Sequence, residues 1–278
     1  MISAGRPRGR RCAVVGSPIE HSLSPVLHHA AYAALRLKDW SYDRFELTEQ
    51  ELPGFVAGLD GSWRGLSVTM PLKAAALELG EVDELAALVG AANTVIFDDD
   101  QTRVYNTDVG GLMSAVRGGG ARRVDQVTIL GAGATARASL VSAGRLGARH
   151  VVVVARSLEK AARLAELADA LGVELDVAGW RTALPAADLL ISTVVAGAAD
   201  HRAEEIAASA AVVFDAIYDP WPTPLAQAAQ AAGRTVLSGL DLLVGQAVLQ
   251  VELMTGLQVS PELLMSAGRT ALSRSGQA

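Results

Sequence analysis

Aromatic residues, cysteine and long apolar runs are scarce in this sequence of 278 residues. Only 4% of the residues are Phe, Trp or Tyr, although 50% are hydrophobic. The one cysteine, Cys12, excludes a disulfide within the chain, and its position in an apolar run predicts that it packs in a strand. No stretch approaches the roughly 20 apolar residues of a membrane-spanning helix. This composition indicates a helix-rich α/β protein, which we expect to be cytoplasmic.

Charge is not concentrated anywhere in the chain. The 24 Lys and Arg and the 30 Asp and Glu give a net charge of −6, with no long block of either sign. Proteins that bind nucleic acids carry a basic patch or stripe, so we expect no nucleic-acid partner. His28, His29, His150 and His201 have no metal-ligand spacing with Cys12 or with an acidic cluster, so we expect no metal site.

Strands and helices alternate in the first part of the chain. The apolar runs CAVVG and TVIF predict buried strands, and SYDRFEL alternates as a strand does. Asp98-Asp99-Asp100 predicts a hairpin turn between TVIF and RVY. This alternation predicts a mostly parallel sheet covered by helices. The predicted strands are 12–16, 41–47, 66–68 and 94–97, and the predicted helices are 25–37 and 74–90.

A second unit begins near residue 106. Residues 127–148, VTILGAGATARASLVSAGRLGA, predict a strand, a glycine-rich turn and a helix. The segment 240–273 predicts two helices separated at Ser260-Pro261. Further strands are predicted at 151–157, 173–177, 188–193, 211–214 and 235–237, with a helix at 158–171.

The pattern Gly131-x-Gly133-x-x-Ala136 follows a strand directly and opens a helix. Gly131 allows a tight turn, Gly133 lets the backbone approach a pyrophosphate, and Ala136 keeps helix and strand close. The helix N-terminus offers free N–H groups to phosphates. This context favours dinucleotide binding over the alternative of a merely tight turn.

The next predicted strand ends on Ala155-Arg156-Ser157, with Lys160 one helical turn later. A protein that binds NAD normally has Asp or Glu here for the ribose 2′-hydroxyl. An arginine instead pairs with a 2′-phosphate through charge-assisted hydrogen bonds. The sequence therefore favours NADP, although Arg156 and Lys160 could also be only the solvated start of a helix.

In the segment GLSVTMPLK, residues 65–73, a lysine follows an apolar strand. This lysine either solvates a loop or presents its ammonium to a ligand. Ser24 followed by Pro25 predicts a helix N-cap, but capping does not explain Ser22. Asn93 stands at the entrance to a strand and Asp108 where the two units join.

Together these segments resemble the shikimate dehydrogenase family. The resemblance covers nearly the whole chain, from residue 17 to residue 247, and the segments occur in the family's order, which makes it specific. The matching segments are SPIEHSLSPVLHHAA, GLSVTMPLK, GAANTV, YNTDVGG, GAGATARA, DAIYDPWPTPL and GLDLLVGQA.

The resemblance implies an N-terminal α/β substrate-binding catalytic domain over 1–105 and a Rossmann-type doubly wound NADP-binding domain over 106–239. The C-terminal helices, 240–278, then return to the first domain. The implied enzyme is an NADP-dependent oxidoreductase acting on CH–OH, which reversibly reduces 3-dehydroshikimate to shikimate with NADPH in aromatic amino-acid biosynthesis. The resemblance implies that these small molecules are its only partners and that it does not associate with a membrane. The implied oligomeric state is a monomer or homodimer.

The resemblance also assigns site residues. Ser22 and Ser24 are implied to bind the substrate carboxylate. The residues implied around the ring hydroxyls and the reacting carbonyl are Thr69, Lys73, Asn93, Asp108, Tyr218 and Gln246. The implied cofactor-binding residues are Glu84, Gly131, Ala132, Gly133, Ala134, Thr135, Arg156, Lys160, Ala216 and Gly239.

Lys73 and Asp108 are the implied catalytic pair. Hydride that arrives at a ketone carbon leaves negative charge on the oxygen, which needs a proton donor within hydrogen-bond reach. An ammonium can supply that proton, and an adjacent carboxylate holds the ammonium in place. We therefore expect both residues to face the substrate in a cleft between the domains.

Several residues depart from the family pattern. Ala134 stands where the turn usually has a further glycine, Ala155 where an Asn usually precedes the arginine, and Val195 where many relatives have a proline. Leu242 replaces a methionine near the nicotinamide, where an apolar wall is still expected. These departures bear on cofactor geometry and affinity rather than on the reaction.

Three other interpretations stay open. The first is a quinate/shikimate dehydrogenase that uses NAD, although Arg156 has no acid nearby to bind ribose hydroxyls. The second is a non-catalytic protein that binds NADP, although such a protein does not need both Lys73 and Asp108. The third is a methylenetetrahydrofolate dehydrogenase, which leaves the paired serines and Gln246 unexplained.

Overall fold

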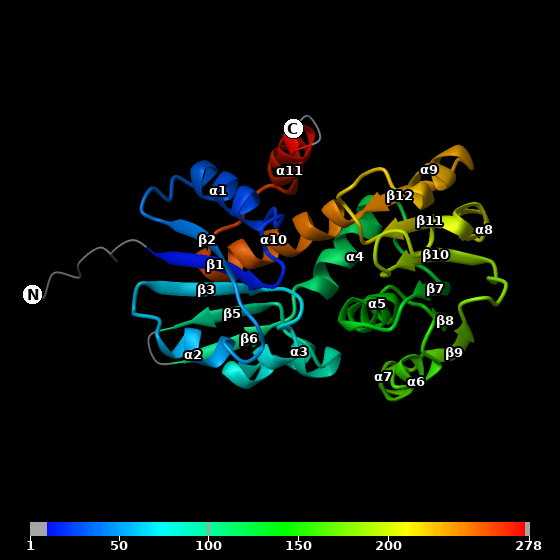
Figure 1. Ribbon diagram of the computed structural model, residues 1–278, viewed down its shortest axis with the longest axis horizontal. Helices are drawn as coiled ribbons and strands as arrows, with labels where there is room; N and C mark the ends of the chain where they lie inside the picture. The colour runs from blue at the N-terminus through cyan, green and yellow to red at the C-terminus, as the bar shows by residue number, and fades with distance from the viewer. Residues whose placement is uncertain (1–9, 99–100, 276–278) are drawn as a thin grey trace, which may run out of the picture. The chain divides into compact units, whose positions relative to one another are not determined.

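The computed structural model describes residues 10–98 and 101–275. It divides into two compact units, one within Met1–Thr107 and Ala247–Ala278 and the other Asp108–Gln246 (Figure 1). The chain passes between them after Thr107 and again inside helix α10 (Gly239–Thr255). The predicted boundaries lie at 105/106 and 239/240, so the second passage comes later in the chain than the sequence indicates.

The first unit is built on a six-stranded sheet with the order β2-β1-β3-β5-β6-β4 (Figure 1). β5 runs antiparallel to both of its neighbours, and the other pairs are parallel. The strands are β1 (Arg11–Gly16), β2 (Ser41–Glu46), β3 (Trp63–Val68), β4 (Glu81–Val82), β5 (Thr94–Phe97) and β6 (Thr102–Tyr105). The helices are α1 (Ser24–Ala34), α2 (Leu52–Ala57), the 3₁₀ helix η1 (Ala75–Leu79), α3 (Glu84–Val89), the last part of α10 and α11 (Pro261–Ser275).

Side chains on alternate positions of each strand point to opposite faces of this sheet. Ala13, Val15, Leu66 and Val68 enter one buried cluster that includes residues of α2, η1 and α3. Cys12, predicted to pack in a strand, is fully buried on β1. Because both faces of β1 are buried, its sequence is a continuous apolar run rather than an alternating one.

The predicted helix at 74–90 is wrong as a single element. It is divided into η1, the short strand β4 and α3, which pairs β4 with β6. Gly80 separates η1 from β4, and a side chain there would overlap the Thr102 backbone. Asp83 then caps α3 by accepting from the N–H groups of Leu85 and Ala86. The predicted hairpin between β5 and β6 is confirmed by their antiparallel pairing, while Asp99 and Asp100 lie outside the described residues.

The second unit has a six-stranded sheet in the order β12-β11-β10-β7-β8-β9, with every pair parallel (Figure 1). Numbered from the first strand of the unit, this is the order 3-2-1-4-5-6 of doubly wound dinucleotide-binding sheets. The strands are β7 (Gln126–Leu130), β8 (His150–Ala155), β9 (Glu174–Gly179), β10 (Ala187–Ser192), β11 (Ala210–Asp215) and β12 (Thr235–Ser238). The helices are α4 (Asp108–Gly118), α5 (Ala134–Arg145), α6 (Leu158–Ala162), α7 (Ala165–Leu171), the 3₁₀ helix η2 (Asp200–Arg202), α8 (Ala203–Ala208), α9 (Pro224–Ala231) and the first part of α10.

Two helical predictions for the later part of the chain need correction. The helix predicted at 158–171 is interrupted between α6 and α7, with Arg163 as the C-cap of the first and Leu164 as the N-cap of the second. The first helix of the tail ends at Thr255, before Gly256 with φ 71°, rather than at Ser260. In the described part of the chain, none of the helices is long and apolar enough to cross a membrane.

Candidate functional site

In the second unit, the glycine-rich turn lies at the carboxyl ends of β7 and β10. These strands are neighbours, and the chain order reverses between them, which is where open α/β sheets bind ligands. Gly131 follows β7 with φ +109°, a left-handed conformation that favours glycine. A side chain there would overlap the hydroxyl of Thr193, which donates to the Leu130 carbonyl at 2.7 Å.

Helix α5 begins at this turn, next to open space at Gly133. Gly133 is the N-cap, no side chain caps the helix, and no acidic residue stands in the first turn. A Cβ added to Gly133 would meet nothing within 4 Å. Because uncapped N–H groups and the helix dipole attract anions, this end of α5 suits a phosphate.

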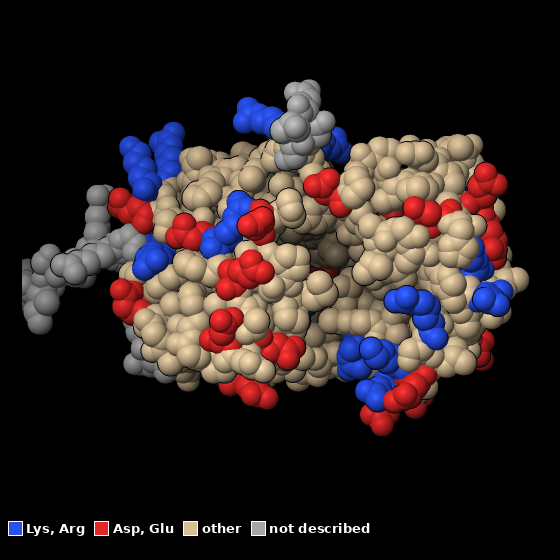
Figure 2. All heavy atoms as spheres, viewed as in Figure 1, with Lys and Arg blue, Asp and Glu red and all other residues tan. Residues whose placement is uncertain are grey.

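A cavity of about 830 Å³ extends from the turn to the end of β8. Arg156 follows β8 directly and is exposed, and Ser157 caps α6 by accepting from the Lys160 N–H at 3.3 Å. Figure 2 shows basic side chains, with acidic ones among them, around α6 and α7. The described residues that line the cavity are Gly131, Ala132, Gly133, Ala155, Arg156, Ser157, Lys160, Trp180, Thr193, Val194, Val195, Gly197, Ala198 and His201.

The sequence did not predict the far wall of this cavity. Trp180 lines it together with His201 and Thr193. These residues lie after β9 and β10, in segments whose positions depend on the strand order. Three of the departures from the family pattern differ in exposure: Ala155 is 5% exposed, Val195 is 72% exposed, and Ala134 is the exposed first residue of α5.

Ala216 and Gly239, two predicted cofactor residues, lie side by side after β11 and β12. The Gly239 N–H donates to the Ile217 carbonyl at 3.1 Å, and a side chain on Gly239 would overlap the Ala216 carbonyl. Close backbone approach therefore requires glycine at this position.

The loop from β11 to α9 carries Tyr218, a predicted substrate residue. Asp215 is 2% exposed at the end of β11 and accepts from the Thr223 hydroxyl at 2.7 Å. The same hydroxyl accepts from the Ala226 N–H and so caps α9. Burial raises the pKa of Asp215 above its usual range, against the opposing hydrogen bond from Thr223. Tyr218 is half-buried, and burial raises the pKa of its phenol.

Asp108 and Gln246 occur on two helices of this unit that touch. Asp108 is the buried first residue of α4. One turn later, a Cβ on Gly111 would lie 2.6 Å from the Gln246 backbone nitrogen, and one on Gly245 would lie 2.6 Å from the Gly111 carbonyl oxygen. Glycine at both positions lets α4 and α10 cross in contact.

In the first unit, Thr69, Lys73 and Asn93 gather at one edge of the sheet. Thr69 and Lys73 follow the carboxyl end of β3, and Asn93 precedes the antiparallel β5, so their backbones meet there. The Asn93 carbonyl accepts from the Val68 N–H at 2.8 Å, and the Lys73 carbonyl accepts from the Ala92 N–H at 2.8 Å. Lys73 is half-buried and Asn93 is 1% exposed.

Ser24 is not the N-cap of α1, so this prediction is wrong. The helix begins at Ser24, its N-cap residue is Leu23, and no side chain caps it. Instead the Ser22 hydroxyl accepts from the Ser24 N–H at 3.3 Å. Ser24 is 5% exposed, and its side chain hydrogen-bonds Tyr42 of β2. Ser22 therefore accepts a hydrogen bond from the first residue of the helix, while the Ser24 side chain is directed to β2.

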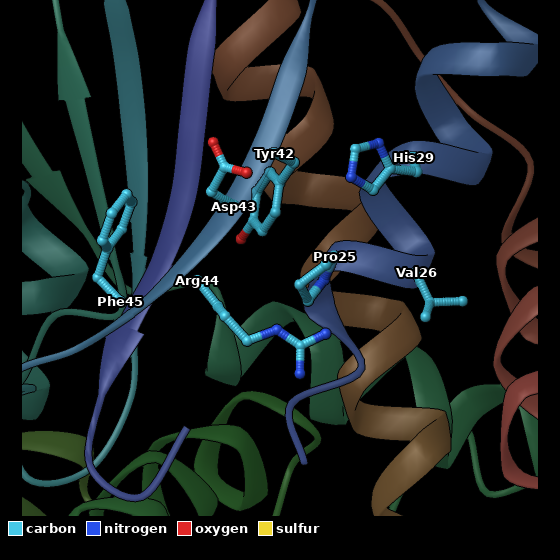
Figure 3. A pocket seen from close by; sticks show the side chains of 7 residues that line it. All are labelled: Pro25, Val26, His29, Tyr42, Asp43, Arg44 and Phe45. Carbon is cyan, nitrogen blue, oxygen red and sulfur yellow. The ribbon is translucent and has the colours of Figure 1, made fainter. Parts of the chain in front are cut away.

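A second hollow, of about 680 Å³, lies between α1 and β2 (Figure 3). Its lining is Pro25, Val26, His29, Tyr42, Asp43, Arg44 and Phe45, none of which is a predicted site residue. Arg44 extends from β2 toward the start of α1 in Figure 3 and donates to the Glu20 carbonyl. This bond ties the edge strand to the loop that carries Ser22.

The predicted residues are thus divided between the two units. The first holds Ser22, Ser24, Thr69, Lys73 and Asn93, together with Glu84, the exposed first residue of α3. The second holds Asp108, Tyr218, Gln246 and the other predicted cofactor residues. That these residues serve one substrate and one cofactor stays a prediction.

Comparison with known proteins matches both units. The model of the shikimate dehydrogenase substrate binding domain matches residues 14–95, and the shikimate/quinate 5-dehydrogenase model matches residues 116–215. Shikimate dehydrogenase (NADP(+)) of Methanothermobacter thermautotrophicus is 35% identical over 273 residues, which cover 94% of this chain and 96% of that protein.

Two solved structures share the fold. Shikimate dehydrogenase of Mycobacterium tuberculosis has 43% sequence identity and a TM-score of 0.89, covering 94% of this chain and 99% of that one. Shikimate 5-dehydrogenase of Thermus thermophilus, in complex with NADP(H) and shikimate, has 32% identity and a TM-score of 0.83, covering 95% of this chain and 100% of that one. On this similarity over nearly its whole length, the chain belongs to the shikimate dehydrogenase family.

Proposed function

We propose that this protein is an NADP-dependent shikimate dehydrogenase, which reversibly reduces 3-dehydroshikimate to shikimate in aromatic amino-acid biosynthesis. The observation that carries the proposal is the similarity, over both units, to proteins named shikimate dehydrogenase (NADP(+)). The Thermus thermophilus relative binds NADP(H) and shikimate together, which supports the same pair of ligands here.

The second unit fits NADP(H). The open space at Gly133 and the uncapped start of α5 suit a pyrophosphate, and Gly131 to Thr135 would hold it. Arg156 and Lys160 would pair with the 2′-phosphate, and none of the described residues lining this cavity is Asp or Glu. When bound, NADPH supplies the hydride. Ala216 and Gly239 would lie near the cofactor with the apolar Leu242, and Glu84 would contact it from the first unit.

On the substrate side, hydroxyl and amide groups suit a polyhydroxylated ring acid. Ser22 and Ser24 would donate to the carboxylate, and the ring hydroxyls would meet Thr69, Asn93, Tyr218 and Gln246. A site built from such donors rejects analogues that lack a hydroxyl, because its own polar groups are left unpaired.

Lys73 and Asp108 are the proposed catalytic residues. The Lys73 ammonium would give its proton to the developing alkoxide oxygen, and the Asp108 carboxylate would orient that ammonium. The retention of both residues distinguishes an enzyme from a protein that only binds NADP. Small-molecule ligands are the proposed partners, in a cytoplasmic monomer or homodimer.

Initial rates with shikimate and with quinate, each with NADP and with NAD, test this proposal. We expect shikimate with NADP to give the highest kcat/KM. A preference for quinate or for NAD would favour the quinate/shikimate dehydrogenase alternative. If neither acid is oxidised with either cofactor, the result would favour the alternative of a non-catalytic protein that binds NADP.

A further inference from the structure

Gln250 is a buried glutamine on the part of α10 that belongs to the first unit, with 1% of its surface exposed. Its Oε1 accepts from the Ser67 hydroxyl at 2.9 Å and lies 3.4 Å from His28 Nε2. Its Nε2 donates to the Asn93 carbonyl at 3.2 Å and to the Thr94 hydroxyl at 3.0 Å. Both ends of this amide are therefore hydrogen-bonded, as a buried polar group requires.

The orientation of this amide follows from its partners. A carbonyl oxygen can only accept, so the Gln250 atom that faces Asn93 must be the NH₂ group. Oε1 must then face Ser67, whose hydroxyl gives its proton to Gln250 and accepts from the Tyr42 hydroxyl at 2.6 Å. Burial raises the pKa of Tyr42, which keeps its phenol protonated as a donor, although hydrogen bonds with Ser67 and Ser24 oppose that shift.

The same reasoning fixes the orientation of the Asn93 side-chain amide. A backbone N–H can only donate, so the Asn93 atom 2.7 Å from the Thr107 nitrogen must be Oδ1. Oδ1 also accepts from the hydroxyls of Thr94 at 3.0 Å and Thr107 at 3.1 Å. The Asn93 NH₂ group therefore points away from these three groups.

These bonds join the two ends of the proposed substrate site of this unit. The path runs from Ser24 through Tyr42 and Ser67 to Gln250, and from there to Asn93. Gln250 contacts both β3 and the start of β5. It therefore fixes the spacing of these strands at the edge where the segment that carries Thr69 and Lys73 begins.

We propose that Gln250 is a positioning residue for the ring acid, holding Asn93 as a hydrogen-bond donor and ordering the hydroxyls that lead to Ser24. The inference rests on the proposed function, since it assumes a shikimate-like ligand at Asn93 and Ser24. Gln250 acts through these residues and does not itself touch the substrate.

Gln250→Met tests this, because methionine has a similar length and makes none of the four contacts. Gln258→Met is the matched control, since Gln258 is an exposed glutamine of the same unit that bonds only Glu252 among its described hydrogen bonds. Steady-state kinetics would give kcat and both KM values, and calorimetry would give the Kd of shikimate.

We expect Gln250→Met to raise the KM and Kd of shikimate about tenfold, the effect of misplacing one or two hydrogen bonds. The KM of NADP and kcat should stay within about twofold, because a contact equal in the ground and transition states appears in KM. Gln258→Met should match the wild type. A merely structural glutamine would lower the melting temperature and leave the KM of shikimate unchanged in the folded enzyme, which would overturn the inference.

Thr94→Val keeps the test decisive if Gln250→Met does not fold. Valine has nearly the shape of threonine, and it removes one acceptor of the Gln250 NH₂ group and one donor to Asn93 Oδ1. We expect a rise of about fivefold in the KM of shikimate alone. An unchanged KM in Thr94→Val would overturn the positioning role. Absence of shikimate oxidation by the wild type would instead refute the proposed function, so the two failures are distinct.

Discussion

Lys73 is the residue on which the proposed chemistry most depends. If its ammonium supplies the proton, Lys73→Met should lower kcat by about two to four decades, with a smaller change in the KM of shikimate. Asp108→Asn should also be slow, and the double variant should lose little more than either single one, because residues that act as a unit are not additive. The measurement is steady-state turnover at saturating NADPH and 3-dehydroshikimate.

Lys38→Met is the control for this experiment, since Lys38 is exposed in the same unit. It should retain wild-type turnover. A kcat near that of the wild type in Lys73→Met would show instead that this lysine only solvates the loop after β3.

Arg156 is expected to decide the choice of cofactor. Arg156→Ala should raise the KM of NADP by about one to two decades, the usual effect of losing hydrogen bonds to a charged group, and should leave the KM of NAD nearly unchanged. Arg163→Ala is the control, because Arg163 is exposed on the same segment and pairs with Glu159 at 2.6 Å. Equal effects of Arg156→Ala on both cofactors would rule out a 2′-phosphate contact.

At the residue scale, motif positions could be predicted from the sequence, but local bonding could not. The glycine turn was predictable because φ +109° at Gly131 favours glycine, and the glycine at position 133 leaves open space beside the start of α5. The role of Ser24 was not predictable, because a serine before a proline is a frequent N-cap and only the position of Tyr42 takes its side chain away. Gln250 had no sequence signal, since its partners are distant in the chain.

At the element scale, strands were predicted better than helices. Buried parallel strands such as β7 and β8 are apolar runs with few alternative interpretations. The segment 74–90 failed because its helix-like spacing conceals β4, which forms only where β6 is available to pair with it. Likewise α6 and α7 share one apolar pattern, and nothing local marks the break at Arg163.

The Asp215 side chain is expected to keep the loop that joins β11 to α9 in place. In Asp215→Ala the buried Thr223 hydroxyl loses its acceptor, so we expect a loss of about 1 to 3 kcal/mol in unfolding free energy. If the loop moves, the KM of shikimate should rise as well, because Tyr218 is carried on it. Chemical denaturation and steady-state kinetics measure the two effects.

Asp215→Asn provides the control, because its amide oxygen still accepts from Thr223. Burial raises the pKa of Asp215 in the folded protein, so its contribution to stability is present at low pH and is lost as the pH rises toward that raised pKa. Asparagine does not titrate, so the stability of the variant should not show this loss as the pH rises, and at pH 8 it should exceed that of Asp215→Ala. A large loss in Asp215→Asn at that pH would contradict this account.

At the scale of the whole molecule, the order of motifs predicted two units and their fold class, but not where the chain divides. The sheet of the second unit follows from alternating strands and helices joined by right-handed crossovers. The passage inside α10 could not be predicted, because one continuous helix of 17 residues contributes to both units. Its sequence gives no boundary signal, since Gln246 and Gln250 are one helical turn apart and serve different units.

One buried histidine, His28, is expected to contribute to the pH dependence of the unfolding free energy. His28 is fully buried, stacks on Tyr42 with ring centroids 4.0 Å apart, and has its pKa lowered by burial to about 3. Between that value and the unfolded pKa of about 6.5, the unfolded chain binds one more proton than the folded one. The stabilisation is therefore complete above about pH 6.5 and is lost as the pH falls, by about 1.4 kcal/mol per pH unit.

His28→Phe keeps an aromatic ring against Tyr42 and removes the titration. Urea denaturation between pH 7 and pH 4 would measure the unfolding free energy of this variant. That free energy should fall with decreasing pH less steeply than in the wild type, by about 1.4 kcal/mol per pH unit, whatever the stability of the variant at pH 7. His29→Asn, at the exposed neighbouring position, should keep the wild-type slope. Parallel curves for the wild type and His28→Phe would mean that His28 is protonated in the folded protein. Protonation would require a buried acceptor or water at Nδ1 of His28. That atom has no hydrogen-bond partner among the described residues.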